Sequence, residues 1–182
     1  MDKFLDLSFQ RLKDFLGEAV EILSWAIVLA IIIRIFLCAP YVIPSRSMSP
    51  ILQPGDRVLV DKLFYRFGEP VRGDIVVLKL PLDERIEYIK RIIALPGETI
   101  EGKNNRVYID GKVLPEGYLP QGIKYDSFGP VRLEEEEYFV MGDNRADSQD
   151  SRIWGALNRK NIKGKAMCIY WPCKRITWLK MT

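Results

Sequence analysis

The sequence predicts a mostly β protein that follows an N-terminal transmembrane helix. The first observation behind this prediction is one long apolar run, from residue 22 to residue 43. The second is a change of pattern after Pro44, where short alternating segments separated by Gly and Pro replace any helical period. The third is length, since 182 residues hold such a helix and about one modest domain.

The N-terminal region divides into an amphipathic segment and the apolar run. Over residues 1–21, apolar side chains recur at spacings of three and four, which is typical of an amphipathic helix on a membrane surface or of the start of the anchor. The run 22–43 contains one charge, Arg34, and a helix of this length would be about 33 Å long, enough to cross a bilayer. Pro40 is expected to end the helix near Ala39. A cleaved signal peptide is the alternative, but its apolar core would be shorter.

Charge does not decide how the predicted helix is oriented in a membrane. Three basic residues precede it and three follow it within about 20 residues. They are Lys3, Arg11 and Lys13 on the first side, and Arg46, Arg57 and Lys62 on the second. The net charge of +3 is too small to indicate nucleic-acid binding, and no nucleic-acid partner is expected.

After the apolar run, residues 44–98 and 139–182 are predicted to form one β domain, with residues 99–138 as a small β insertion. The insertion is richer in Gly, Pro and Glu than its surroundings, and its Asp110-Gly111 pair indicates a tight hairpin. In the main domain, the alternating segments are 57–61, 74–80 and 87–95.

The absence of histidine narrows the chemistry that this chain can perform. A Ser-His-Asp triad, a Cys-His pair and a histidine metal site are all excluded, so a general base would be Asp, Glu, Lys, Tyr or a thiolate. The three cysteines Cys38, Cys168 and Cys173 lack zinc spacing and are interpreted as small apolar side chains. A disulfide between Cys168 and Cys173 is the alternative if the domain is exported.

Three segments hold the residues that could carry chemistry. The first is IPSRSMSPILQPGD (43–56), which contains Ser47 directly after the apolar run; the second is GDIVVLKLP…EYIKRIIALPGE, with Lys90 in a strand. The third is MGDNRADSQDSRIWG (141–155). Strand alternation places Lys90 on the side of Tyr88 and Ile92, and burial there would lower the pKa of its amine. The alternative is a surface charge on a half-exposed strand.

The third segment could also suggest a calcium loop that begins at Asp143. It fails as an EF-hand, because its positions three, six and twelve are Arg145, Ser148 and Trp154. Neither a metal nor a cofactor is therefore expected.

In this order, the three segments resemble the signature boxes of the type I signal peptidases, and the preceding apolar helix agrees with that family. The resemblance implies a coiled antiparallel β-sheet or partly open barrel. It also implies Ser47 as the nucleophile and Lys90 as the general base. Ser45 resembles the side chain of the oxyanion hole, and Ser148 resembles the serine that orients the lysine amine. The pairs Arg91–Asp143 and Asp150–Arg152 resemble structural ion pairs.

The resemblance further implies removal of N-terminal signal peptides from secretory preproteins after A-x-A-like sites. Segments 41–47 and 87–90 are extended and are expected to pair with the substrate backbone as added strands. The candidates for lining small pockets are Ile43, Met48, Leu52, Tyr88 and Ile89. Some positions between the signature residues depart from the family pattern, so the pocket shape is expected to differ more than the chemistry. They are Arg46, Ile51, Ala146 and Asp147.

By the same resemblance, the partners are secretory preproteins, the lipid bilayer and the secretion translocon. The expected location is the bacterial plasma membrane, crossed once, with the catalytic domain on the extracytoplasmic side; an organellar inner or thylakoid membrane stays open. Two other interpretations also stay open. One is a self-cleaving Ser-Lys repressor, although a DNA-binding domain would stand where this chain has its apolar helix. The other is a non-catalytic, membrane-tethered β module that binds a partner.

Overall fold

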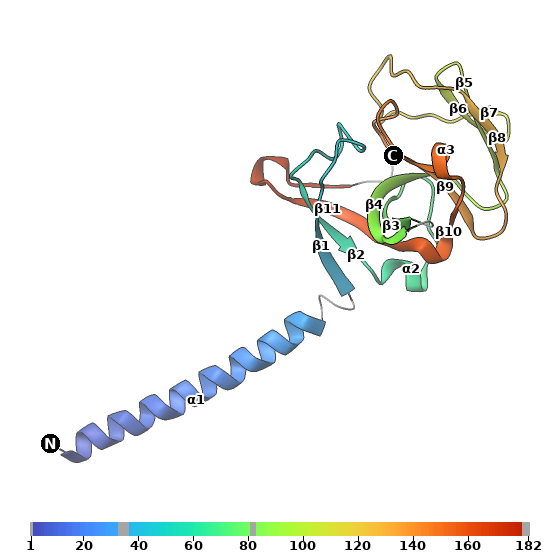
Figure 1. The fold of residues 1–182 in the computed structure, drawn as a ribbon. Helices are drawn as coiled ribbons and strands as arrows, with labels where there is room; N and C mark the ends of the chain where they lie inside the picture. Colours follow the sequence, from blue (N-terminus) through green and yellow to red (C-terminus); the bar gives the residue numbers. More distant parts are fainter. Residues whose placement is uncertain (1, 33–36, 81–82, 180–182) are drawn as a thin grey trace. The chain divides into compact units, whose positions relative to one another are not determined.

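The computed structural model of the chain describes residues 2–32, 37–80 and 83–179. It separates into two compact units, residues 1–38 and residues 39–182, and each is considered by itself (Figure 1). The first unit consists of helix α1, Asp2–Ile32, and the second is mostly antiparallel β-structure.

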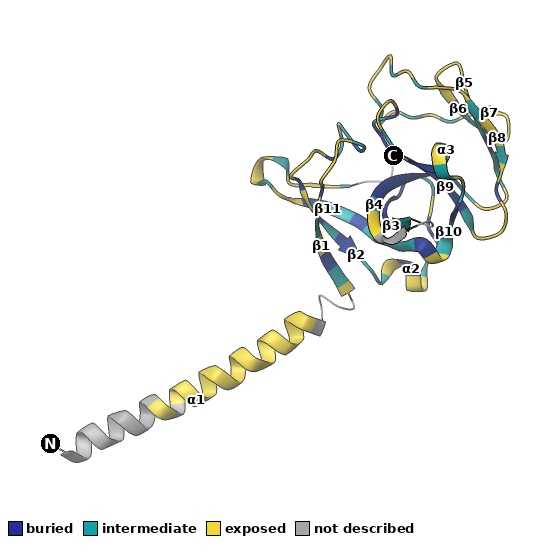
Figure 2. Cartoon of the chain, in the orientation of Figure 1, coloured by how far each residue is buried: buried dark blue, intermediate teal, exposed yellow. Residues whose placement is uncertain are grey.

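Helix α1 leaves its apolar side chains exposed along the part whose side chains are described (Figure 2). The large ones are Phe15, Leu16, Val20, Ile22, Leu23, Trp25, Ile27, Val28, Leu29 and Ile31. Across residues 2–32, 37–80 and 83–179, the structure contains no helix with the length and apolar character that a bilayer crossing requires.

The helix was expected to end near Ala39 within the apolar run 22–43, and strand structure begins at Cys38. Residues 33–36, including Arg34, lie outside the described part, and the chain then forms strand β1, Cys38–Val42, beside strand β2. The sheet buries Ala39 and Ile43, which are 8% and 2% exposed. Pro40 is tolerated because β1 lies at the end of the strand order, and edge strands are where proline is found in sheets.

The larger sheet has the order β1-β2-β11-β3-β4-β9-β10, with β12 paired to β11. The bounds of its further strands are β2 Arg57–Asp61, β3 Ile75–Leu80, β4 Asp83–Ala94, β9 Glu137–Met141, β10 Leu157–Asn158, β11 Ile162–Trp171 and β12 Thr177–Trp178. Short helical turns connect them: α2 Phe64–Phe67, α3 Ser151–Trp154, η2 Arg159–Asn161 and η3 Cys173–Arg175. The expectation of a mostly β chain is confirmed.

Strand β4 links the two sides of this sheet. Its first part pairs with β3, where Lys90 lies opposite Val76, and its end pairs with β9, where Arg91 lies opposite Met141. Residues 89–94 are buried without interruption (Figure 2). A strand between two neighbours and covered on both faces can hold a polar side chain away from water, and Lys90 occupies such a position.

A second sheet of order β7-β6-β5-β8 is built from residues 99–132. Its strands are β5 Thr99–Lys103, β6 Arg106–Ile109, β7 Lys112–Val113 and β8 Phe128–Arg132. Asp110 and Gly111 turn the chain between β6 and β7 with φ values of 48° and 77°, as the tight hairpin requires. The loop from residue 114 to residue 127 leaves this sheet and carries Glu116 and Tyr118.

Candidate active site

Ser47 and Lys90 meet although 43 positions separate them in the sequence. Ser47 lies in a turn that follows β1, and this turn is closed by hydrogen bonds from Ser49 N to Arg46 O and from Leu52 N to Met48 O, each 2.9 Å. Lys90 comes from the middle of β4. Its Nζ donates a hydrogen bond of 2.9 Å to Ser47 Oγ.

The environment of Lys90 makes its amine unusually easy to deprotonate. The residue is 1% exposed, and burial lowers its pKa to about 8 against the opposing influence of Asp150 and Asp143. Its Nζ also lies 5.2 Å from the centre of the Tyr88 ring, on the side where strand alternation places that neighbour. A hydroxyl beside a largely buried, partly neutral amine is an arrangement suited to nucleophilic attack by serine.

Ser45 and Gly142 both lie close to Ser47. The Ser45 hydroxyl donates to Ser47 Oγ at 3.3 Å. A Cβ placed on Gly142 would lie 2.4 Å from the Ser47 carbonyl oxygen, so the chain approaches closely there and only glycine fits. The backbone N–H of Asn144 also donates to that carbonyl, at 3.0 Å.

Ser148 packs against the same glycine but makes no hydrogen bond to Lys90. Its Oγ is buried, has no hydrogen-bond partner of ordinary geometry among the described residues, and would be 2.2 Å from a Cβ on Gly142. It nevertheless lies close enough to Asp150 to favour the ionised form of that carboxyl. The role of Ser148 in orienting the Lys90 amine therefore stays a prediction, since no hydrogen bond joins the two side chains in this structure.

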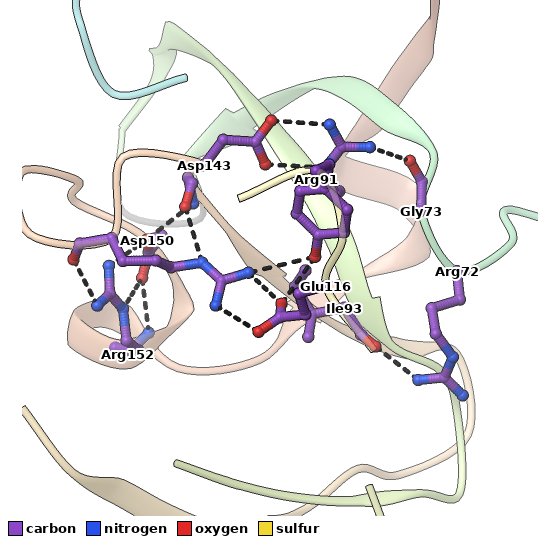
Figure 3. Close-up of polar contacts among 11 residues, drawn as sticks. Arg72, Gly73, Arg91, Ile93, Glu116, Asp143, Asp150 and Arg152 are labelled. Atoms are coloured by element: carbon purple, nitrogen blue, oxygen red, sulfur yellow. Dashed lines mark hydrogen bonds and ion pairs between the residues drawn. The ribbon is translucent and has the colours of Figure 1, made fainter. Parts of the chain in front are cut away.

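Two ion pairs fix the segment after β9: one joins Asp143 to Arg91 of β4, and the other joins Asp150 to Arg152 of α3 (Figure 3). Arg91 donates from Nε and Nη2 to the two oxygens of Asp143, at 2.8 and 2.7 Å, and from Nη1 to Gly73 O at 2.8 Å. Arg152 contacts Asp150 at 2.8 Å from both Nε and Nη2. Burial opposes ionisation of Asp150, but the hydrogen bonds and charge of Arg152 hold its pKa below the usual range.

A small cavity of about 40 Å³ lies between β1 and β4. Most of its lining residues come from the segments that precede Ser47 and Lys90 in the sequence. Three of the predicted pocket residues, Ile43, Tyr88 and Ile89, line it together with Tyr41, Glu87 and others. Met48 and Leu52 were predicted to line such pockets too, but both are 0% exposed and belong to the hydrophobic core. The turn after Ser47 directs these two side chains into the core, and neither lines this cavity.

Sequence reasoning missed three residues of this region. Arg145 is 1% exposed and binds Glu116 and Tyr118, which come from the loop 114–127. The arginine lies within a segment that was singled out, whereas the two loop residues carry no local signal of burial. Their contacts depend on how the insertion folds back, which no local pattern describes.

The cysteines and possible metal ligands play no visible part in this site. Cys168 and Cys173 are free thiols and form no disulfide with each other. Over residues 2–32, 37–80 and 83–179, no group of three or more Cys, Asp or Glu side chains could hold a metal ion.

Comparison with known proteins gives a consistent result. The family model described as "Signal peptidase, peptidase S26" matches residues 16–171. The chain is 42% identical over 168 residues to "Probable signal peptidase I-1" of Synechocystis sp., which covers 88% of this chain and 85% of that relative. It is 43% identical over 169 residues to "Signal peptidase I S" of Bacillus subtilis, with coverage of 84% and 90%. It is 40% identical over 180 residues to a "Signal peptidase I" of Bacillus amyloliquefaciens, with coverage of 90% and 96%.

Proposed function

The chain belongs to the peptidase S26 family and is a type I signal peptidase, a serine endopeptidase, and from this premise we propose that Ser47 is its nucleophile and Lys90 its general base. Membership of this family excludes the two other interpretations, the self-cleaving Ser-Lys repressor and the non-catalytic β module that binds a partner. The observation that carries the proposal is the contact of 2.9 Å between Ser47 Oγ and a lysine amine that is almost fully buried.

The proposed reaction runs through an acyl-enzyme. Neutral Lys90 accepts the Ser47 proton while Oγ attacks the scissile carbonyl carbon and forms a tetrahedral oxyanion. The intermediate collapses, the C–N bond breaks, and Lys90 gives the proton to the leaving amine of the mature protein. Lys90 next takes one proton from water as the water oxygen attacks the ester carbon. The C–O bond to Ser47 then breaks, Lys90 returns that proton to Ser47 Oγ, and the signal peptide leaves as a carboxylic acid that ionises in solvent.

We assign the oxyanion hole to the Ser45 hydroxyl and the backbone N–H of Ser47. Ser45 Oγ already lies 3.3 Å from the nucleophilic oxygen, so a short rotation would bring it to a developing oxyanion. Loss of one such donor costs about 3 kcal/mol of transition-state stabilisation. The unpaired Ser148 hydroxyl has a proposed role after acylation, when Ser47 Oγ becomes an ester and the Lys90 amine needs another partner to orient it.

The substrate is proposed to lie as an added strand between residues 41–44 and 87–89, which flank the small cavity. The cavity is small, about 40 Å³, and Ile43, Val77 and Ile89 are among the side chains that line it. A small cavity with apolar lining next to the proposed dyad supports cleavage after an A-x-A-like site at the end of the signal peptide.

We also propose that α1 holds the enzyme at a membrane, because its apolar side chains from Phe15 to Ile31 are exposed. By the family resemblance, the N-terminus would be cytoplasmic and the catalytic domain extracytoplasmic, beside the bilayer and the secretion translocon. Signal peptides are apolar segments held in the same bilayer, so tethering would raise the local concentration of substrate at the enzyme.

The test is to incubate the purified protein with a secretory preprotein in detergent and to locate the cut by mass. We expect cleavage after the small-x-small motif. Ser47→Ala and Lys90→Met should each abolish it, since nucleophile and base act as one unit. Lys90→Arg should fail as well, because guanidinium does not give up its proton. Circular dichroism is the folding control, and near-normal cleavage by folded Lys90→Met would exclude the Ser-Lys mechanism.

A further inference from the structure

The loop 114–127 reaches from the insertion into the ion-pair network beside the proposed dyad. We propose that Glu116 and Tyr118 are positioning residues for the cleavage reaction: they hold Arg145 and Arg91, and thereby keep the Asp143 and Asp150 carboxylates in place beside the Lys90 amine. Figure 3 shows Glu116 within this network, among Arg91, Asp150 and Arg152. The inference rests on the proposed function of Lys90.

Glu116 supplies the counter-charge for a buried guanidinium. The Arg145 side chain is 0% exposed; its Nη1 donates to Glu116 Oε2 at 3.1 Å, and its Nη2 bonds Glu116 Oε1. The carboxylates of the neighbouring segment are already engaged, Asp143 by Arg91 and Asp150 by Arg152. An unpaired buried charge is strongly unfavourable, so Arg145 without Glu116 would compete for one of these two carboxylates or leave its place.

Arg145 is tied to the backbone that carries both carboxylates. Its Nε donates to Gly142 O at 3.1 Å, and its own carbonyl accepts a bond of 2.7 Å from Arg152 Nη1. The N–H of Gly142 in turn donates to Asp150 Oδ2 at 2.9 Å. A movement of Arg145 would therefore displace Asp150 through Gly142 and Arg152.

Tyr118 connects the second arginine to the same loop. Its ring lies 4.1 Å from the Arg91 guanidinium carbon, which is a cation–π contact. Its hydroxyl donates to Glu116 Oε1 at 2.7 Å and accepts from Arg145 Nη2 at 3.3 Å. Tyr118 thus fixes Glu116 while it covers Arg91, the residue that holds Asp143 from β4.

The charged groups around Lys90 predict the sign of the effect. Asp143 and Asp150 face Lys90 from the segment after β9, and Arg152 faces it from α3. Ser47 faces it from the turn after β1. On β4, Arg91 and Tyr88 flank Lys90, and the residue opposite on β3 is apolar. Burial lowers the pKa of Lys90, and the two carboxylates oppose this effect. Displacement of the carboxylates removes this opposition and lowers the pKa further.

The decisive variant is Glu116→Gln in the full-length protein in detergent, assayed with a signal-sequence peptide. We expect kcat to fall by roughly ten-fold or more while KM changes by less than about two-fold, because positioning acts mainly on the transition state. The rising limb of the pH profile should move to lower pH by about half a unit or more. Glu101→Gln is the matched control, since Glu101 forms an exposed ion pair with Lys103 inside the insertion at 2.7 Å, and it should leave all three quantities unchanged.

A direct titration separates this inference from the proposed function. The ¹³Cε signal of Lys90, assigned by its loss in Lys90→Met, reports the protonation of the amine whether or not the enzyme uses it. A downward shift of its midpoint in Glu116→Gln supports the positioning role, even if Lys90→Met were to remain active. An unchanged midpoint, or an upward shift, would overturn it. If Glu116→Gln does not fold, Tyr118→Phe decides instead: it keeps the ring on Arg91, removes one hydroxyl, and should shift the midpoint in the same direction by less.

Discussion

At the scale of single residues, the site depends on a competition over the charge of Lys90. Burial removes water from the amine, while Asp150 and Asp143 stabilise its protonated form, and burial has the larger effect. With a pKa of about 8, roughly one amine in ten is neutral at pH 7, whereas an ordinary lysine is neutral in fewer than about one copy in a thousand. The fold thereby raises the population of the free base at least about a hundred-fold.

The pH dependence of cleavage follows from this shift. A base works only when it is unprotonated, so kcat/KM should rise with pH, have its midpoint near pH 8, and level off above it. An exposed lysine would place the midpoint near the usual ~10.4. The measurement is kcat/KM for a signal-sequence peptide between pH 5 and pH 10. A limb centred near pH 6 would point to a carboxylate base instead.

The Arg91–Asp143 pair should matter mainly for stability. Both side chains are nearly inaccessible, at 2% and 0% exposed, so Asp143→Asn leaves a buried guanidinium without its full counter-charge. We expect the free energy of unfolding to fall by about 3–5 kcal/mol, measured by urea denaturation.

The control for that variant is Glu69→Gln. Glu69 pairs with Arg159 at 2.7 Å, but its side chain is 71% exposed. An exposed pair contributes up to about 1 kcal/mol, so this change should cost little. Equal losses in the two variants would contradict the distinction between buried and exposed pairs.

At the scale of elements, three segments that are distant in the sequence form the site: the turn after β1, the middle of β4 and the segment after β9. The turn supplies Ser47, and hydrogen bonds from its backbone close it. The segment after β9 packs against that turn through Gly142, where the absence of a side chain allows the two backbones to approach. Close backbone contact, together with the hydrogen bonds from Asn144 N to Ser47 O and from Asn144 Nδ2 to Arg46 O, therefore sets the position of Ser47 relative to the segment that carries Asp143 and Asp150.

Gly142→Ala tests this contact. A methyl group there would lie 2.4 Å from Ser47 O and 2.2 Å from Ser148 Oγ, so the turn or the segment must move. Displacement by about 1 Å is enough to lower kcat on the order of a hundred-fold. The control is Gly68→Ala, whose Cβ would meet its nearest atom at an ordinary 3.4 Å. Normal kcat in Gly142→Ala would show that the site tolerates movement here.

At the scale of the whole molecule, the proposed membrane tether, α1, and the candidate active site belong to different units of the chain. Every contact described for Ser47 and Lys90 lies within residues 39–182, and α1 contributes none of the site residues named here. Catalysis and membrane association should therefore be separable by truncation just before β1.

A fragment of residues 37–182 retains β1 and should cleave a signal-sequence peptide at a rate within about ten-fold of the full chain. The full chain should remain with membranes after a high-salt wash, because its attachment is apolar rather than electrostatic. A larger share of the fragment should be released. Equal membrane retention of both proteins would assign the attachment to the catalytic unit, and a folded but inactive fragment would contradict the separation.

Much of this protein was predictable from the order of its residues. The absence of histidine limited the choice of base, and the segments around Ser47, Lys90 and residues 141–155 carried the resemblance to the signal peptidases. The β character and the Asp110-Gly111 hairpin followed from local patterns, because alternation and turn residues act over a few positions. Local signals of this kind do not depend on what the rest of the chain does.

The tertiary structure alone decided which apolar residues line the cavity and which charged side chains form ion pairs. Residues 38–42 continue an apolar run yet join the sheet, and Met48 and Leu52 enter the core rather than the pocket. Glu116 and Tyr118 reach Arg145 and Arg91 across 27 positions or more. The physical reason is that burial and ion pairing depend on contacts between distant segments, and a period of two or 3.6 says which side of an element is apolar but not what covers it.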